Sequence, residues 1–498
     1  MTVGFDVNDS IIMCFNELGC GEAALNKFSA IMGIPGFAHT TYQRLSQKVG
    51  RAQQEIASGV LSAAAVAVHQ AYADHGMDND TENEPTVGEE NDSDAADRHV
   101  VENNERLGLE DHVPVRDVSV SFDGSWHKRG FTSNYGVGIV IDVTTGLALD
   151  FEVLSKHCQA CSKNEKINMT EGDRLLWRME HAQKCSKNYD GSSKGMEREA
   201  AVRMWGRSIE RNKMRYTSML SDGDSVAFKA VSELGIYPVT KLECINHLDK
   251  RFGTALRKKA KEGKLGGRRH GALTAKACNV LQSYYRNSVV KNLNDQTKMK
   301  DAIWASFLHC SSSDEHPQHE NCPVGHESWC FYQKALARGE NPPMHKENIG
   351  TPLAPDVATA IRPIYERMTD DTLLARIQHG RTQNANESLN GQIWAKCPKT
   401  IHVGLGRVQA AVASAVSQYN QGYSHLSQVL CHLGVTSDRS LRAYQSQKDC
   451  KRCTLGDKTC RPETKRARRA KGQQKKTQND RQERHEGPTY GPGLLGVE

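Results

Sequence analysis

Two aspartates at the ends of alternating apolar segments are the residues whose type and position point most directly to chemistry. From Val118 to Asp123 apolar and polar side chains alternate, which predicts a β-strand, and a glycine follows Asp123 at once. A second predicted strand, Tyr216 to Leu220, runs into Asp222 and another glycine. A carboxylate at the end of an apolar strand is costly to bury without a partner such as a cation. On neighbouring strands, the two acids could hold divalent metal ions that assist phosphoryl transfer.

The residue types alone leave a third acid open. Asp224 follows Asp222 closely, and its simplest role is that of a helix N-cap. Glu387 lies at the start of another predicted helix, where a first-turn glutamate complements the helix dipole. Residue type and position therefore indicate Asp123 and Asp222 as candidate metal ligands and do not indicate a third acid.

The elements that must position these acids follow in an order typical of a layered α/β fold. Predicted strands cover 118–123, 135–143, 147–154, 216–220 and 237–242, and predicted helices cover 196–209 and 225–234. The short turn 144–146 implies an antiparallel hairpin. Three antiparallel strands, then helix, strand, helix and strand, is the order of a ribonuclease-H-like core.

The two ends of the chain differ from this core in composition. Residues 1–75 are predicted to be a helical region, which we interpret as a bundle or an arm for assembly. Residues 76–112 are acidic and poor in large apolar side chains, which predicts a disordered linker. Residues 426–498 form a basic tail predicted to be largely disordered. Within it, Lys465 to Lys471 is a candidate nuclear import signal or non-specific DNA contact.

A first group of cysteines and a histidine has the spacing of zinc ligands. Cys158 and Cys161 are separated by two residues, and His181 and Cys185 by three. They lie in a polar, lysine-rich stretch, 157–186, that a structural zinc ion could hold together as a knuckle. The alternative is a set of free surface thiols.

A second group, in 309–330, has more candidates than one zinc ion needs. Its members are His309, Cys310, His316, His319, Cys322, His326 and Cys330. The chain has 15 cysteines in all, an odd number with several near histidines. This pattern favours metal sites in a reducing compartment over disulfides.

A densely basic stretch follows the predicted last strand. Its members are Lys250, Arg251, Arg257, Lys258, Lys259, Lys261, Lys264, Arg268 and Arg269. A run of charge is usually a solvated helix face. Here it adjoins the candidate acids and could neutralise DNA phosphates without regard to base sequence.

Composition bounds the class of protein. With 498 residues, 38% hydrophobic and 25% charged, most of the chain is expected to fold into two to four domains. No run approaches the ~18–20 apolar residues of a membrane span, and we expect no secretory signal at the start. The net charge of +6 is unevenly distributed along the chain, which makes a nucleic-acid partner worth testing.

Four short motifs occur in one order and carry a family resemblance. They are Asp123-Gly-Ser-Trp126, Ser221-Asp-Gly-Asp224, Cys244-Ile-Asn-His247 and the segment from Thr382 to Asn390 that contains Asn-Glu-Ser. Together, over roughly residues 115–425, they resemble the Mutator-like DDE transposases of animal genomes. The resemblance implies a catalytic triad of Asp123, Asp222 and Glu387, with Cys244 and His247 near the site.

The resemblance also implies an architecture and partners. A ribonuclease-H-like core, 113–248 and 379–425, would be interrupted by a mainly helical insertion, 249–378, that contains the second Cys/His group. The family pattern selects Cys310, His319, Cys322 and Cys330 as zinc ligands, and His309 could replace one of them. We expect catalytic Mg²⁺ or Mn²⁺, structural Zn²⁺, double-stranded DNA as partner, a homo-oligomer, a nuclear location and no membrane.

Three functions remain open on the sequence. The first is a transposase that cuts DNA by hydrolysis and joins ends by transesterification. The second is a domesticated, transposase-derived DNA-binding protein without catalytic activity. The third is a ribonuclease-H-like nuclease with another substrate, since a fold does not determine a function.

Overall fold

A computed structural model describes residues 6–74, 113–128, 132–222 and 226–461, together with a few positions between 463 and 470. The predicted acidic linker and most of the basic segment after residue 464 lie outside the described residues. The chain divides into two compact units, one of residues 11–420 and one of residues 1–10 with 421–498.

A five-stranded mixed sheet lies at the centre of the larger unit, in the order β3-β2-β1-β4-β5. The strands are β1 (Arg116–Trp126), β2 (Tyr135–Asp142), β3 (Ala148–Ser155), β4 (Met214–Ser221) and β5 (Thr240–Glu243). β1 pairs with β2, and β2 with β3, in antiparallel fashion, while β1–β4 and β4–β5 are parallel. β5 begins three residues later than the sequence predicted. Pro238 explains this, because a proline cannot donate a ladder hydrogen bond.

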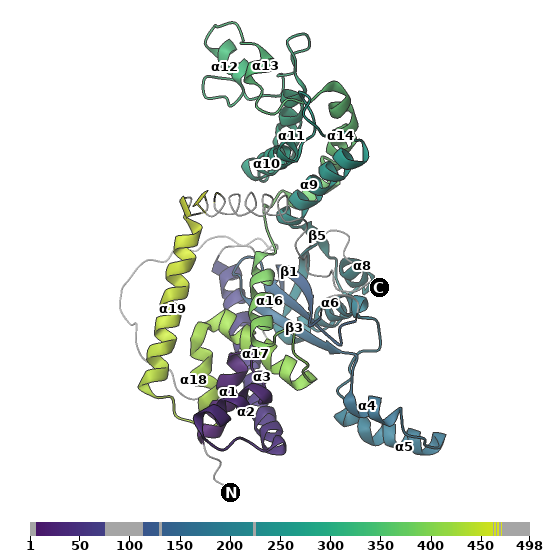
Figure 1. Ribbon diagram of the computed structural model, residues 1–498, viewed down its shortest axis with the longest axis vertical. Coiled ribbons are helices and arrows are strands. Elements are labelled where there is room, and N and C mark those ends of the chain that lie inside the picture. Colours follow the sequence, from purple (N-terminus) through teal and green to yellow (C-terminus); the bar gives the residue numbers. More distant parts are fainter. Residues whose placement is uncertain are drawn as a thin grey trace. The chain divides into compact units, whose positions relative to one another are not determined.

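Helices cover both faces of the sheet (Figure 1). α6 (Met196–Gly206) and α8 (Val226–Glu233) pack on the face that receives the alternating Val118, Val120 and Phe122 of β1. α16 (Asn384–Lys396) and α17 (Leu405–Gln421) pack on the other face, against β2 and β3. The helix predicted over 196–209 is two helices, because α6 ends at Gly206 and the short α7 (Ser208–Asn212) follows.

α6 approaches the sheet unusually closely. A Cβ atom added to Gly136 would lie 2.8 Å from the Sδ atom of Met196, and one added to Gly138 would lie 2.6 Å from the Cβ atom of Ala200. Real Cβ atoms essentially never come so close, so these glycines are what allows α6 to rest on β2. The position of α6 over the sheet is thereby tightly fixed.

The N-terminal region is helical, with α1 (Asp6–Glu17), α2 (Glu22–Met32) and α3 (His39–Asp74). By length and composition alone, α3 is long and apolar enough to cross a membrane. Its residues Leu61, Ala65, Val68 and Tyr72 are, however, buried in the two hydrophobic clusters on the sheet faces. Core packing therefore accounts for their apolar character.

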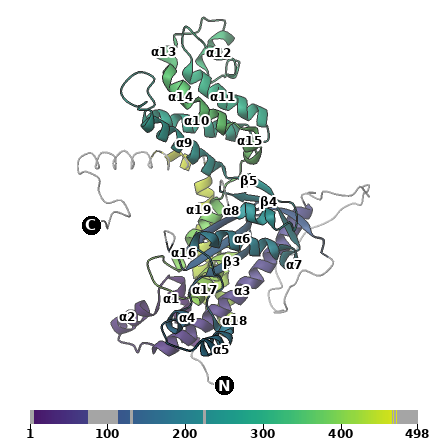
Figure 2. The same cartoon turned by 90° about the vertical axis from the view of Figure 1, so that its right-hand side faces the viewer.

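The segment between β5 and α16 is helical, and Figure 2 shows its long helices side by side. They are α9 (Ile245–Glu262), α10 (Ala275–Lys291), α11 (Gln296–Ser311), α14 (Pro355–Met368) and α15 (Asp371–Ile377), with the short α12 (Phe331–Ala337) and α13 (His345–Asn348) between α11 and α14. At the centre of their hydrophobic core, Phe252 stacks on Tyr285 and meets Tyr365 edge-on. The segment leaves and rejoins the sheet region at one point. There, the amide of Ile245 donates to the carbonyl of Arg381 at 3.3 Å, and Asn246 bonds to Asn384 at 2.9 Å.

The smaller unit corrects one prediction. Where the sequence predicted a largely disordered tail from residue 426, the structure has α18 (His425–His432) and α19 (Arg439–Cys460). Asp438 caps α19 by accepting the amide of Leu441 at 2.7 Å, and Asp449 accepts the amide of Tyr423 at 3.0 Å. α19 lacks a clear apolar period, which is why the sequence did not indicate it, and these polar contacts help to hold it. α18 does bury Leu426 and Val429 at helical spacing, but it is only eight residues long.

Candidate active site

Asp123 and Asp222 lie at the same edge of the sheet. β1 and β4 are parallel neighbours, with Ser121 paired to Leu220, so both aspartates come two residues beyond that pair. Sequence alone could place each acid at a strand end, and the parallel pairing is what brings the two ends together. Gly223, Asp224 and Ser225 lie outside the described residues, so the N-cap proposed for Asp224 is not described.

Asp123 is the most enclosed acid of the site. Its Oδ2 atom accepts a 2.8 Å hydrogen bond from Nδ2 of Asn390. Burial, followed by the negative charges of Glu197 and Glu387, raises the pKa of Asp123 to about 7, against an ordinary 3.8. The hydrogen bond from Asn390 acts in the opposite direction and is outweighed. The side chain is therefore costly to ionise unless a cation is near.

Two amide side chains attach α16 to β1 and so carry Glu387 to the site. The side chain of Asn386 accepts from Oγ of Ser121 at 2.5 Å and donates to the Ser121 carbonyl at 3.4 Å. Gln383 donates through Nε2 to the carbonyl of Phe122 at 2.8 Å. Glu387, in the first turn of α16, remains exposed. The chain thus brings Glu387 to the strand end that carries Asp123.

His247 lies between the other two acids. Its Nδ1 atom is 3.4 Å from Oδ1 of Asp222, and its Nε2 atom is 3.7 Å from Oε1 of Glu387. Cys244 is the buried N-cap residue of α9, and its sulfur accepts the amide of Gln383 at 3.4 Å. Cys244 therefore joins α9 to α16, and the imidazole of His247 lies between two carboxylates.

Sequence reasoning missed a fourth acid, Glu197. Its side chain passes over Gly124, where an added Cβ would lie 2.6 Å from Cγ of Glu197. Burial, and then the charge of Asp222, raises the pKa of Glu197. In the sequence Glu197 is only a first-turn glutamate of a helix, and no spacing marks it.

The donor set fits divalent cations that keep several waters. Carboxylates are the protein ligands that Mg²⁺ and Mn²⁺ prefer, typically one or two for each ion. Within the described ranges, only the two cysteine–histidine groups have donor atoms all within 4.8 Å of one another, so the acids are spread more widely than a single compact cage. Two buried amides, Asn390 and Gln383, each donate toward β1 and leave their side-chain oxygens without a hydrogen-bond partner. Such oxygens are further acceptors for a cation or its waters.

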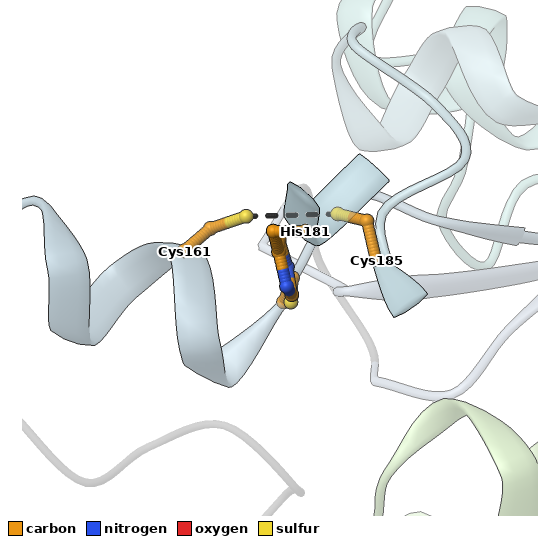
Figure 3. A group of neighbouring side chains, drawn as sticks. Cys161, His181 and Cys185 are labelled. Carbon is orange, nitrogen blue, oxygen red and sulfur yellow. Dashed lines mark hydrogen bonds between the residues drawn. The ribbon is translucent and has the colours of Figure 1, made fainter. Parts of the chain in front are cut away.

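The first cysteine–histidine group converges as predicted. Cys158 precedes α4 (Gln159–Asn164) and His181 ends α5 (Glu171–His181). Sγ of Cys158 is 3.2 Å from Nε2 of His181, and the sulfurs of Cys161 and Cys185 face each other at 3.6 Å (Figure 3). A tetrahedral zinc ion would set these edges at about 3.6 and 3.8 Å, from bond lengths near 2.0–2.1 Å to nitrogen and 2.3 Å to sulfur. The four residues therefore fit zinc.

The second group is His309, His319, Cys322 and Cys330, all buried. Nδ1 of His319 lies 3.2 Å from Nδ1 of His309 and 3.4 Å from the sulfur of Cys330. The sulfur of Cys322 lies 3.8 Å from both histidine nitrogens. These edges also suit a tetrahedral zinc site.

Cys310, which the family pattern selected as a ligand, is not in this group. Neighbouring helix residues differ in direction by about 100°, so His309 and Cys310 cannot both face the group. Cys310 points into the hydrophobic core of the helical segment, where burial raises the pKa of its thiol to about 12. His309 takes its place, while His316 and His326 are exposed and outside the group.

His345 and Asp314 support the second group, and sequence reasoning missed both. Nε2 of His345 is 2.9 Å from Nε2 of His319, and its Nδ1 is 2.7 Å from Oδ1 of Asp314. A ligating histidine commonly bonds through its other nitrogen to such a partner, which orients the ring.

A groove of about 590 Å³ adjoins the acids. Its lining comprises Asp222, His247, Lys250, Arg251, Thr254, Ala255, Lys258, Arg367 and Met368. Lys250, Thr254 and Lys258 are four residues apart on α9 and share one face of that helix. The groove thus joins an acidic end to a basic wall.

The other predicted DNA-binding residues divide into three kinds. Arg257 bonds to Asn279 and Gln282, and Arg269 pairs with Asp356, so both have structural partners. Arg251 lines the groove but also pairs with Glu243 at 3.0 Å. The remaining residues, Lys259, Lys261, Lys264 and Arg268, are exposed outside the groove lining.

An acidic sheet edge beside a basic groove is an arrangement suited to phosphoryl transfer on a polyanion. A family model described as Mutator-like transposase matches residues 2–105 and 94–330. The match covers well over half of the chain, and the chain belongs to the Mutator-like transposase family. No curated protein and no solved structure matches it.

Family membership indicates a transposase function, with nuclease or transferase activity, DNA binding and the divalent-metal dependence general to transposases. The matched residues include Asp123 and Asp222 and end before Glu387.

Proposed function

We propose that the protein is a DDE-type transposase that cuts and joins DNA strands on a ribonuclease-H-like core, with Asp123, Asp222 and Glu387 as its catalytic acids. The observation that carries the proposal is the pairing of β1 with β4, which puts Asp123 and Asp222 at one sheet edge. The amide contacts of α16 with β1 add Glu387 to that edge. The strand order β3-β2-β1-β4-β5, with helices on both faces, supports the choice of core.

Each residue has a defined part in this proposal. Bound Mg²⁺ or Mn²⁺ would activate the attacking hydroxyl and stabilise the leaving oxygen during in-line displacement at phosphorus. Asp123, Asp222 and Glu387 would hold the cations, and Asn390 orients Asp123 through its 2.8 Å hydrogen bond. His247 positions the carboxylates of Asp222 and Glu387, since its two nitrogens face one each.

A cleavage assay tests the proposal. We expect the full-length protein to nick or cut duplex DNA with Mg²⁺ or Mn²⁺ and not with EDTA. Asp222→Asn and Glu387→Gln should each lower the rate at least about a thousandfold, because several kcal/mol of charge stabilisation are lost. Glu199→Gln is the matched control, since Glu199 instead pairs with Arg203 at 2.9 Å.

Two outcomes would count against the proposal. Undiminished cleavage by Asp222→Asn would show that the acids are assigned wrongly. DNA binding without metal-dependent cleavage by the wild-type protein would favour the alternative of a domesticated DNA-binding protein.

The groove predicts how the protein binds DNA. We propose that Lys250, Lys258 and Arg367 contact the phosphates of the strand that enters the site. Each alanine variant should weaken binding to duplexes of any sequence and reduce the slope of log K against log salt by about one. Arg269→Ala is the control, because Arg269 pairs with Asp356 and lies outside the groove. Fluorescence anisotropy at several salt concentrations measures both quantities, and an unchanged slope in all three variants would exclude the groove as the DNA path.

A further inference from the structure

Glu197 reaches the acidic edge from the face of the sheet opposite to α16. The close packing of Met196 on Gly136 and of Ala200 on Gly138 fixes α6, and therefore fixes the residue between them. Gly124, directly after Asp123, leaves open the path along which the side chain of Glu197 runs. A side chain larger than hydrogen at position 124 would have to displace Glu197.

The carboxylate of Glu197 has acidic neighbours and, within the described residues, no cationic partner. The charges that it interacts with are those of Asp123 and Asp222, both acids. Glu199, two residues along the same helix, is paired with Arg203 at 2.9 Å. A carboxylate held beside two others without a counter-charge raises the energy of the empty site.

A second observation points to a ligand at this edge. Asn390 is only 8% exposed, and its Nδ2 atom donates to Asp123. Its Oδ1 atom has no hydrogen-bond partner. A buried acceptor oxygen left unpaired is costly, and beside carboxylates it suits a cation or a cation-bound water.

The charge balance of a site with two cations favours a further carboxylate. Two divalent cations bring a charge of +4, whereas Asp123, Asp222 and Glu387 supply −3 when ionised. A fourth carboxylate would make the loaded site neutral before the phosphate of the substrate enters.

We propose that Glu197 is a fourth carboxylate of the cation site and holds divalent metal together with Asp123 and Asp222. This inference rests on the proposed function, because it assigns a further ligand to the same site. Metal binding would then involve α6 as well as β1, β4 and α16, the elements that carry or precede the three other acids.

Binding of Mn²⁺ to the full chain tests the inference without any reaction. Electron paramagnetic resonance counts free and bound Mn²⁺, and a thermal melt in divalent-free buffer, with zinc retained, measures the empty protein. Glu197→Gln should weaken Mn²⁺ binding at least about tenfold, the lower end of what losing a supporting group costs at a metal site. It should also melt at a higher temperature than wild type without Mn²⁺, because a repulsive charge is gone. Glu199→Gln is the matched control and should bind Mn²⁺ like wild type.

The outcomes separate this inference from the proposed function. If Glu197→Gln binds Mn²⁺ like wild type while Asp123→Asn does not, Glu197 is not a ligand and the three-acid site stands. If Glu197→Gln melts lower than wild type in divalent-free buffer and binds Mn²⁺ equally well, its role is structural and the inference is wrong. If Asp123→Asn also binds like wild type, the cation site itself is misplaced.

Discussion

Replacing Cys330 by serine is expected to release one zinc ion per chain and to unfold the segment around α12. The sulfur of Cys330 lies 3.4 Å from Nδ1 of His319, and the whole group is buried. Structural zinc contributes its binding energy directly to folding, so its loss should cost on the order of 5 kcal/mol or more. Elemental analysis measures the zinc, and limited proteolysis measures the opening of 312–344.

Cys310→Ala is the control for this prediction, because it separates the two possible ligand sets. The thiol of Cys310 is in the hydrophobic core, so its removal should lower stability modestly and leave the zinc content unchanged. His309→Ala should instead lose the zinc ion, as Cys330→Ser does. Loss of zinc from Cys310→Ala with retention in His309→Ala would restore the ligand set that the family pattern selected.

Asp123→Asn is expected to stabilise the divalent-free protein at pH 8 while abolishing cleavage. The pKa of Asp123 is about 7 in the fold and 3.8 ordinarily, so the folded protein binds the proton more tightly than the unfolded chain does. The stability that this proton contributes is complete below about pH 4 and is lost as the pH rises through about 7. The asparagine variant does not suffer this loss and should be more stable than wild type at pH 8, by up to a few kcal/mol. Near pH 5, where less than half of this stability has been lost, the gain should be correspondingly smaller, and below about pH 4 it should vanish.

Urea unfolding between pH 5 and pH 8 in divalent-free buffer measures this effect. Adding Mn²⁺ at pH 8 should then raise the stability of wild type and leave the variant nearly unchanged, since only the folded wild-type site binds the ion. A variant that is less stable than wild type at pH 8 without Mn²⁺ would mean that the ionised Asp123 has a favourable partner in the fold.

The sheet was largely predictable, because its signal is local. Alternation along Val118 to Phe122 reflects the burial of one strand face, and the structure buries those residues under α6. The edge shared by Asp123 and Asp222 depends on which strands pair, and strand order only suggested that pairing. The helix α19 was not predicted, because its sequence has no apolar period. Polar contacts such as the cap from Asp438 stabilise it instead.

Two site features could not be read from spacing. Glu197 joins the acids only because Gly124 lets a helix from the other face approach, and this is a relation between elements far apart in the chain. The choice between His309 and Cys310 depends on the rotation of α11, which is set by its packing against α10, α14 and α15. Family resemblance supplied the position of Glu387, which the residue types alone assigned to a helix dipole.

The helical segment between β5 and α16 begins and ends at one place, where Ile245 bonds to Arg381 and Asn246 to Asn384. Chain ends that already touch let the sequence between them be lengthened, shortened or exchanged at small entropic cost to the fold that remains. The main constraint falls on the first turn of α9, because His247 of that turn lies between Asp222 and Glu387. Beyond that turn, and apart from the groove residues Lys250, Lys258 and Arg367, the segment can therefore diverge between relatives, and an engineer could replace it, while the acidic edge keeps its geometry.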